Sequence, residues 1–397
     1  MTSPAQPQFL REGHINGLRL KNRLIKAGTF ENMTPGGQPG EALNQFHGRI
    51  ADGGAAMTTI GYCAVADHGR LNANMMYMHE GLRPALSAMI DMLHARGAAV
   101  SGQMGHCGGF SKNAAMKGRI KGPSAMLNTL GIGSGMAISP AMSIADIDAM
   151  VQDYFNAARF MKSVGFDAVE IHFGHGYGLC QFISPLTNRR RDEYGGSLEN
   201  RMRLPLRVLQ AVRDAVGEHF PILGKVSMSE GARGGIDYDD NIAICRMLDR
   251  AGIDAIVTSG GTSTRNPMLM FRGASILPGI IRHEKSPFLK LAFRLMQPFI
   301  FKPQPYHELY FLQEAKRVRD AVNCKLIYVG GASTPESFEK LMAEGFDFVQ
   351  LGRTLLADPE LPVSASLGKR SRCIHCNDCI GTIESDVGIH CPRFPAQ

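Results

Sequence analysis

Residues 169–177 read Val169-Glu170-Ile171-His172-Phe173-Gly174-His175-Gly176-Tyr177, a short apolar run that ends in two histidines and a tyrosine. The chain continues through Gln181–Pro185 and Asn188–Asp192 into the Gly- and charge-rich segment Tyr194–Arg201. Polar groups at the end of a buried strand, followed by such a loop, are typical of the way an α/β enzyme displays catalytic side chains. A strand end with two surface histidines is the simpler alternative.

Around this stretch, eight short β-rich runs alternate with longer helical patterns. Amphipathic segments such as Leu82–Arg96 and Ile144–Val164 separate the runs, and glycines such as Gly97 and Gly165 follow them, as expected at helix C-termini. Eight strand–helix alternations predict an α/β fold with parallel strands closed into a (β/α)8 TIM barrel. A doubly wound sheet is the competing arrangement, but neither a Gly-x-Gly-x-x-Gly turn nor a Walker loop is present. The predicted strands are Arg23–Ala27, Ala56–Cys63, Ala98–Gln103, Ala168–Ile171, Ile222–Val226, Ala255–Val257, Lys325–Val329 and Phe348–Leu351.

Three segments depart from the barrel pattern. Residues 13–20 predict an N-terminal hairpin that turns at Asn16-Gly17. Residues 104–141 are rich in Gly, Met and Ser and predict a long loop over one face of the barrel, and residues 264–307 form a long insertion after the sixth strand. We therefore expect a barrel domain over residues 1–365 and a Cys-rich metal-binding tail over residues 366–397 that packs on it.

Within the insertion, Pro287–Phe301 is apolar but carries Lys290, Arg294 and Gln297 at helical spacing, opposite a stripe that includes Phe293. The segment is too short to span a bilayer. A helix packed on the barrel is the simplest interpretation, and a lid, a substrate-tail site or a membrane-surface patch are the alternatives. The basic residues of the insertion also suggest a site for an anionic tail such as a coenzyme A phosphate; they are Arg272, Arg282, Lys285, Lys290, Arg294 and Lys302.

Composition narrows the class of protein. The net charge is +7, but Lys and Arg are scattered, so nucleic-acid binding is disfavoured and anionic ligands are plausible. No uncharged apolar run is long enough to span a membrane, and Met1–Pro7 lacks the layout of a signal peptide. Nine cysteines, four of them crowded near the C-terminus, do not form a disulfide framework. We expect a cytoplasmic protein without a transmembrane segment, for which a homo-oligomer is possible.

The residues just beyond the strands describe a ligand site. Glycines after the last two strands let backbone N–H groups approach an anion, and an arginine there adds a fixed charge, as in barrels that bind phosphate. A glutamine on the third strand can donate and accept hydrogen bonds at the edge of a ring, and a lysine on the fifth can hold negative charge. Together these residues predict a phosphate-bearing heteroaromatic cofactor across the barrel mouth. The candidates are Ala27, Gly28, Thr29, Gly61, Gln103, Lys225, Gly330, Gly331, Gly352 and Arg353.

His172, His175 and Tyr177 are the candidate catalytic residues. Two imidazoles two strand steps apart can both donate to one carbonyl oxygen, which polarises it and stabilises an enolate. The Tyr177 hydroxyl is neutral at pH 7 and is a natural proton donor. This set fits hydride addition to an electron-poor C=C bond followed by protonation. Zinc bound by the two histidines is an alternative, but no third ligand is apparent.

These motifs resemble the old yellow enzyme family of FMN-dependent ene-reductases. The resemblance runs from Leu20–Arg23 through Gln103–His106, Val169–Tyr177 and Asn188–Arg201 to Leu351–Pro359. It implies that His172 and His175 bind the substrate carbonyl oxygen beneath the flavin and that Tyr177 protonates the α-carbon. It also implies that the strand-end residues named above bind FMN, whose N5 delivers hydride to the β-carbon.

The chain departs from the family pattern at three places beside the flavin. Gly28-Thr29-Phe30 stands where the family usually has Pro-Met-Thr or Pro-Met-Cys, so Phe30 cannot offer the usual hydrogen bond. Lys225 replaces an arginine, and Gly61-Tyr62 replaces a Glu-Ala or Glu-Gly pair. Flavin potential and substrate preference are therefore expected to be unusual.

The C-terminal cysteines form a second motif, Cys373-x2-Cys376-x2-Cys379-x11-Cys391. Four thiolates at such spacing can hold an iron–sulfur cluster or a structural zinc. The motif resembles the cluster segment of the 2,4-dienoyl-CoA reductase branch, which usually has three residues between the second and third cysteines. A 4Fe–4S cluster is favoured over zinc.

The sequence therefore predicts an FMN-dependent NAD(P)H oxidoreductase that reduces activated C=C bonds of enones, enals or enoyl thioesters. NAD(P)H is expected to reduce FMN directly, or a separate electron-donor protein feeds electrons through the cluster. A flavin-dependent amine dehydrogenase or demethylase on the same barrel is one alternative. A catalytically weak redox or metal sensor that uses the Cys tail is another.

Overall fold

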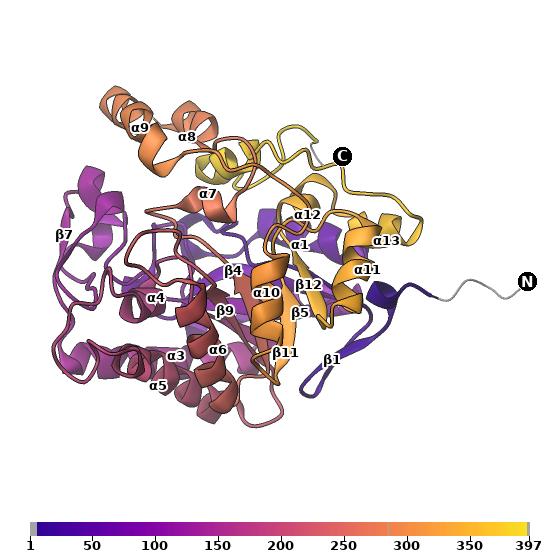
Figure 1. The fold of residues 1–397 in the computed structure, drawn as a ribbon, viewed down its shortest axis with the longest axis horizontal. Helices are drawn as coiled ribbons and strands as arrows, with labels where there is room; N and C mark the ends of the chain where they lie inside the picture. Colours follow the sequence, from indigo (N-terminus) through magenta and orange to yellow (C-terminus); the bar gives the residue numbers. More distant parts are fainter. Residues whose placement is uncertain (1–5, 285, 395–397) are drawn as a thin grey trace, which may run out of the picture.

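Eight parallel strands close into a barrel in the computed structural model, which describes residues 6–284 and 286–394 (Figure 1). The order around the barrel is β10-β11-β12-β3-β4-β5-β8-β9, and every neighbouring pair is parallel. The predicted (β/α)8 barrel is confirmed. The strands are β3 (Leu24–Lys26), β4 (Met57–Ala64), β5 (Ala99–Gly105), β8 (Ala168–His172), β9 (Ile222–Ser227), β10 (Ala255–Ser259), β11 (Lys325–Tyr328) and β12 (Phe348–Leu351).

The lower part of the barrel interior is apolar and is closed by the N-terminal hairpin. Strands β1 (Gly13–Ile15) and β2 (Leu18–Leu20) pair antiparallel across the predicted Asn16-Gly17 turn. Ile15 and Leu20 are buried in one cluster with inward-facing residues of the barrel strands, among them Met57 and Phe348. Because alternate strand residues face inward, this layer leaves the upper positions of the same strands for a polar layer.

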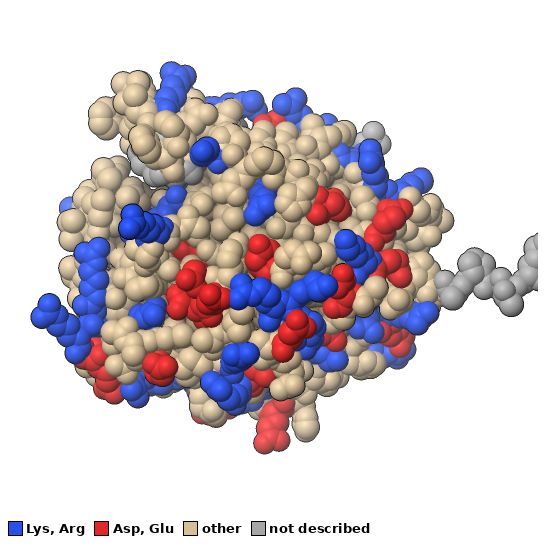
Figure 2. All heavy atoms as spheres, in the orientation of Figure 1, with Lys and Arg blue, Asp and Glu red and all other residues tan. Residues whose placement is uncertain are grey.

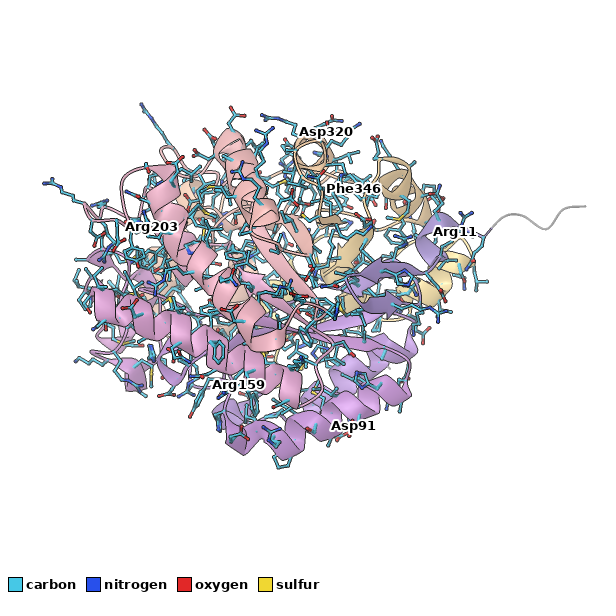
Figure 3. All side chains as sticks on the ribbon, turned by 90° about the horizontal axis from the view of Figure 1, so that it is seen from below. Arg11, Asp91, Arg159, Arg203, Asp320 and Phe346 are labelled. Atoms are coloured by element: carbon cyan, nitrogen blue, oxygen red, sulfur yellow. The ribbon has the colours of Figure 1, made fainter. Side chains whose placement is uncertain are left out.

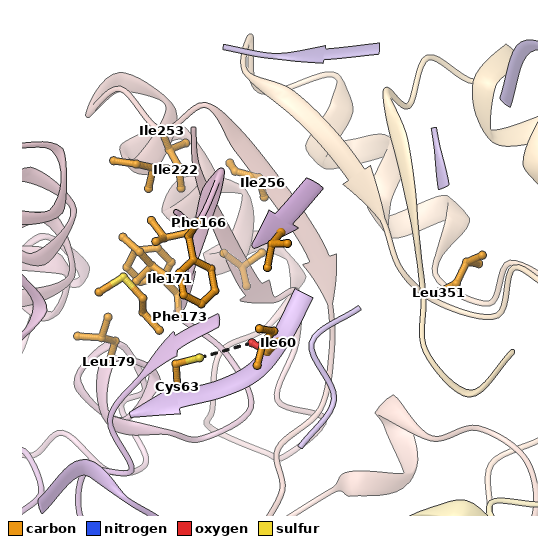
Figure 4. Packing of buried hydrophobic residues seen from close by; sticks show 14 of the residues in the cluster. Ile60, Cys63, Phe166, Ile171, Phe173, Leu179, Ile222, Ile253, Ile256 and Leu351 are labelled. Atoms are coloured by element: carbon orange, nitrogen blue, oxygen red, sulfur yellow. Dashed lines mark hydrogen bonds between the residues drawn. The ribbon is translucent and has the colours of Figure 1, made fainter. Parts of the chain in front are cut away.

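Helices surround the barrel, and the larger core lies between them and the strands. Outward-facing strand residues such as Ile60, Ile171 and Ile256 belong to this core, and Figure 4 shows Phe166 and Phe173 packed beside Ile171. Figure 3 shows Asp91, Arg159 and Arg203 on the outer helices, seen from below. The surrounding helices are α1 (Glu41–Asp52), α2 (Arg83–Ala95), α3 (Ile144–Ser163), α5 (Leu198–Val216), α6 (Tyr238–Arg250), α10 (Leu312–Arg319) and α11 (Pro335–Ala343).

Two of these helices show how local sequence sets their ends. Helix α3 begins in a capping box in which the Ser143 side chain accepts from Asp146 N–H and Asp146 reaches back to Ser143. Gly165, which follows α3, has φ +107°, the left-handed conformation that glycine adopts readily. Helix α10 begins only at Leu312, because the residues before it lie against Gly330 and Gly331 instead of continuing the helix.

The two long insertions both follow C-terminal ends of strands. The segment after β5 contains the short strands β6 (Met126–Leu127) and β7 (Ile138–Ser139) with a 3-10 helix, η6 (Thr129–Ser134), between them. The segment after β10 forms α7 (Pro267–Met270), α8 (Leu277–His283) and α9 (Pro287–Ile300). The expected helix at 287–301 is confirmed, but it packs chiefly on α8 and not on the barrel strands.

The C-terminal residues pack over the same end of the barrel. Helix α12 (Arg353–Ala357) follows β12 directly, and α13 (Leu361–Ser366) and α14 (Asp378–Gly381) come after it, with α14 against α8. Ile389 and Cys391 belong to the main core. Within the described residues, no helix is both long and apolar enough to cross a membrane.

Candidate active site

His172 is the last residue of β8 and faces the barrel interior, because it is in phase with Ala168 and Glu170. Its Nδ1 accepts a hydrogen bond from Gly174 N–H at 3.2 Å. The neutral ring therefore carries its hydrogen on Nε2 and presents a donor. Burial, and then the charge of Lys225, lowers the pKa of His172 to about 3. The imidazole is neutral over the range in which enzymes work.

His175 reaches the site by a turn and not by strand alternation. The strand ends at His172, and His175 adopts φ +60°, which few residues other than glycine adopt. Its backbone N–H donates to Ser227 Oγ at 2.8 Å, and its Nε2 lies 2.8 Å from Ser259 Oγ. The two imidazole centroids are 4.9 Å apart. The two histidines are together as predicted, although the predicted two-step strand spacing is wrong. Burial, followed by the neighbouring His172 and Lys225, lowers the pKa of His175 well below its usual value.

Tyr177 completes the cluster on the same turn. Its ring stacks on Tyr62, with centroids 5.5 Å apart, and lies 5.2 Å from the His172 ring. Its hydroxyl accepts a hydrogen bond from Ser263 at 3.3 Å. Burial raises the pKa of Tyr177, so the phenol keeps its proton. Sequence reasoning gave no role to Tyr62 or Ser263.

A buried polar layer lies directly below this cluster. The Glu170 carboxylate lies 2.9 Å from Lys225 Nζ and accepts from Gln103 Nε2 and Gln350 Nε2, each at 2.6 Å. Burial alone would raise the pKa of Glu170, but Lys225 and the two amides bring it below the usual range. Gln103 and Lys225 were predicted from sequence, whereas Glu170 and Gln350 were missed. The period-two alternation that places Glu170 and His172 on one face of β8 was the available signal.

Glycines allow the ends of neighbouring strands to approach closely beside this layer. A Cβ on Gly28 would lie 2.8 Å from Gln103 Nε2, and one on Gly61 would lie 2.9 Å from Gly28 Cα. Beside Gly352, in contrast, an added Cβ would meet only Thr29, at 4.0 Å. Ala27 N–H bonds to Leu351 O at 2.9 Å and so ties the first strand end to the last.

The remaining predicted cofactor residues have protein partners. Gly330 and Gly331, after β11, have positive φ values of +153° and +79°, and the side chains of Phe311 and Tyr310 lie close to them. Arg353 donates to Arg272 O at 2.8 Å and to the Asn377 side-chain oxygen. The guanidinium therefore links the barrel, the insertion and the tail. The residues from Ala27 to Arg353 that sequence singled out all lie near C-terminal ends of barrel strands.

The four tail cysteines gather beside Arg353. Cys379 and Cys391 are buried, and Cys373 and Cys376 are half-buried. Burial raises the pKa of Cys379 to about 12, with Cys373, Cys391 and Cys376 acting in the same direction. Among residues 6–284 and 286–394, however, no three His, Cys, Asp or Glu side chains are arranged to hold a single metal ion.

The comparisons with known proteins agree with this barrel. The model of the NADH:flavin oxidoreductase / NADH oxidase family matches residues 14–264. The chain is 36% identical over 386 residues to 4,4'-dithiodibutanoate disulfide reductase of Rhodococcus erythropolis, covering 96% of this chain and 94% of that protein. It is 29% identical over 388 residues to an NADH oxidase of Thermoanaerobacter brockii, covering 94% of this chain and 54% of that protein.

Solved structures share the fold. Morphinone reductase in complex with tetrahydroNAD matches with a TM-score of 0.70 and 23% identity, over 91% of both chains. The old yellow enzyme homologue of Zymomonas mobilis matches with a TM-score of 0.72 and 20% identity, covering 98% of this chain and 100% of that chain. The chain belongs to the NADH:flavin oxidoreductase / NADH oxidase family, and thus to the oxidoreductases of the old yellow enzyme type.

Proposed function

We propose that the chain is an FMN-dependent NAD(P)H oxidoreductase that reduces activated C=C bonds of enones, enals or enoyl thioesters. The observation that carries the proposal is the cluster of two neutral imidazoles and one protonated phenol above a charged, hydrogen-bonded layer. Neutral donors suit a carbonyl oxygen that gains negative charge, because they stabilise the charge without quenching it by full proton transfer.

The residues at the barrel mouth fit FMN. Lys225 and Gln103 each use one N–H on Glu170. Because an ammonium has three N–H donors and an amide has two, both side chains keep donors for the flavin ring. The open space beside Gly352 and the positive-φ glycines after β11 suit a phosphate. We assign FMN binding to Ala27, Gly28, Thr29, Gly61, Gln103, Lys225, Gly330, Gly331, Gly352 and Arg353. When bound, FMN would take hydride from NAD(P)H and pass it to the β-carbon of the substrate.

The side chains of the cluster then have separate roles. His172 presents Nε2–H, and Ser259 can donate to His175 Nε2, which leaves the hydrogen of that ring on Nδ1. Both rings would hold the substrate carbonyl. Tyr177 would give its proton to the α-carbon, with Ser263 as a hydrogen-bond donor that stabilises the phenolate left behind.

Reduction of disulfides is a second candidate, favoured by the similarity to the Rhodococcus disulfide reductase over nearly the whole of both chains. In that reaction the disulfide and NAD(P)H with one proton would give two thiols and NAD(P)+. The same barrel mouth would receive the disulfide.

One anaerobic experiment distinguishes the candidates. The purified protein should show flavin absorbance near about 450 nm, lose it on addition of NADH or NADPH, and regain it with cyclohexenone. Faster reoxidation by 4,4'-dithiodibutanoate than by the enone would favour the disulfide reaction. Bleaching by an amine without nicotinamide would favour an amine dehydrogenase. A protein that binds no flavin would contradict all three.

We also propose that Cys373, Cys376, Cys379 and Cys391 hold a 4Fe–4S cluster. A cluster binds one thiolate at each of four irons, and four neighbouring thiols match that donor set. The tail would then lie beside the FMN site through the Arg353–Asn377 hydrogen bond.

A further inference from the structure

Exposed large apolar side chains gather on the two insertions. Among the residues that the structure describes, thirteen such side chains are exposed, and eight of them lie in residues 127–138 and 288–299. On α9, the exposed fractions of Phe288, Leu295 and Phe299 are 76%, 67% and 84%. Large apolar side chains that gather on the surface in this way mark an interaction site. We call the eight residues the apolar rim; they are Leu127, Leu130, Ile132, Ile138, Phe288, Leu291, Leu295 and Phe299.

The two segments lie side by side at the mouth of the barrel. They follow the C-terminal ends of β5 and β10, which face the same way in a parallel barrel. The Leu289 side chain of α9 lies 3.9 Å from the position of a Cβ on Gly133 in η6. In Figure 1, β7 and α9 occupy the same upper left side of the molecule. The two parts of the apolar rim therefore lie on neighbouring insertions at the same end of the barrel.

Helix α9 has three distinct faces. Phe293 lies on the packed face, where its ring meets Phe301 edge-on at 6.2 Å and joins the cluster with α8. Phe288, Leu291, Leu295 and Phe299 follow at spacings of three and four residues and form a second, exposed apolar face. Lys290 and Arg294 lie between these faces. The exposed apolar face of α9 therefore takes no part in packing the helix on α8.

The charged residues of the two insertions are mainly basic. Residues 264–307 contain seven Lys and Arg but only Glu284 as an acid, and residues 110–143 contain four Lys and Arg and no acid. Three of these basic residues are paired, since Lys112, Arg119 and Lys121 form salt bridges with acids outside the two insertions. Within the described residues, Lys117, Lys290 and Arg294 form no salt bridge. Figure 2 shows mainly blue and tan atoms around α9, with the red atoms mostly lower on the molecule.

We propose that the apolar rim and its basic flank bind the surface of an anionic phospholipid bilayer. An apolar helical face flanked by Lys and Arg inserts at the headgroup boundary while the basic residues contact anionic lipid. A second copy of the chain is a poorer occupant, because a two-fold contact would set the same basic residues against each other. Binding in this way turns the barrel mouth toward the bilayer.

The test is flotation of the flavin-loaded full chain with vesicles of phosphatidylcholine alone and of phosphatidylcholine mixed with phosphatidylglycerol. We expect binding to the anionic vesicles, weakened by salt. The variants Phe288→Gln with Leu295→Gln, and separately Lys290→Glu with Arg294→Glu, should each lower the partition coefficient by at least about tenfold. Their flavin spectrum and thermal midpoint should match the wild type.

Matched controls lie directly after α13, which Figure 1 shows on the opposite side of the view from α9. Leu367 is 70% exposed, and Lys369 and Arg370 beside it are exposed. Leu367→Gln, and Lys369→Glu with Arg370→Glu, should leave vesicle binding unchanged. The proposal fails if the wild type does not float with anionic vesicles at low salt, or if these controls reduce vesicle binding as much as the α9 variants. It also fails if the wild type forms oligomers that Leu295→Gln dissociates without any effect on vesicles.

Discussion

The Glu170 carboxylate and the Lys225 ammonium form a buried ion pair, 2.9 Å apart, inside the barrel. Two amides, those of Gln103 and Gln350, donate to the same carboxylate. The pair joins β8 to β9, while the amides join it to β5 and β12, so one side chain couples four strands. Because His172 is the next inward residue above Glu170, this layer supports the candidate active site from below.

Lys225→Met should strongly destabilise the protein. It leaves the Glu170 carboxylate buried without its cation, a change that typically costs about 3–5 kcal/mol of unfolding free energy. Urea unfolding measures it. The matched control is Lys325→Met, which breaks an ion pair with Asp347 at the surface and should cost less than about 1 kcal/mol. Combining Lys225→Met with Glu170→Gln should recover part of the loss. A Lys225→Met protein as stable as the control would show that the pair adds nothing.

Tyr177→Phe should slow enone reduction by roughly 10²–10⁴-fold and leave reduction of the flavin by NAD(P)H unchanged. Only enone reduction needs a proton at the α-carbon of the substrate. Stopped-flow measurement separates the two half-reactions. The control is Tyr154→Phe, at a buried tyrosine of α3 whose hydroxyl has no hydrogen-bond partner among the described residues. Disulfide turnover should fall far less, since a thiolate leaves without an acid. An unaltered enone rate would remove Tyr177 from the mechanism.

The fold was predictable because buried barrel strands are short apolar runs between glycine-terminated helices. All eight predicted strands begin and end within two residues of the observed ones. What local patterns cannot show is which surfaces meet. Helix α10 starts late because Phe311 and Tyr310 cover the glycines after β11, a contact between segments distant in sequence.

The residue types of the candidate active site were predictable from the sequence, but the hydrogen-bond partners of those residues were less so. His172, His175 and Tyr177 lie together as expected, but a left-handed residue at 175 replaces the expected strand spacing. Glu170 reads as an ordinary polar strand residue until the barrel closes and brings Gln350 from β12 against it. Arg353 was expected to bind phosphate; in the structure its guanidinium donates to Arg272 O and to the Asn377 side-chain oxygen, partners that the sequence did not indicate.

Acid should destabilise the protein through its buried histidines. Burial lowers the pKa of His106 and of His172 to about 3. Between that value and the ordinary pKa of about 6.5, the unfolded chain binds protons that the folded chain does not, so stability falls as pH falls. Each such histidine contributes a slope of about 1.4 kcal/mol per pH unit. Urea unfolding across this window measures it.

The variant that isolates this effect is His106→Gln. It should make the pH slope shallower by about one proton, because the folded protein no longer holds a histidine whose pKa burial has lowered. An identical slope for His106→Gln and the wild type would show that His106 titrates alike in both states.

Cys391→Ser should remove the metal centre of the tail. Protein purified without air should contain about four irons with labile sulfide per chain, and the variant should lose them together with absorbance near roughly 400 nm. It should also melt at a lower temperature, because Cys391 and Ile389 belong to the main core. The control is Cys324→Ser, which replaces a half-buried cysteine just before β11. The protein with this substitution should keep its iron. One zinc per chain, lost in the same variant, would assign the four thiols to a structural zinc. No metal in anaerobic wild-type protein would contradict both.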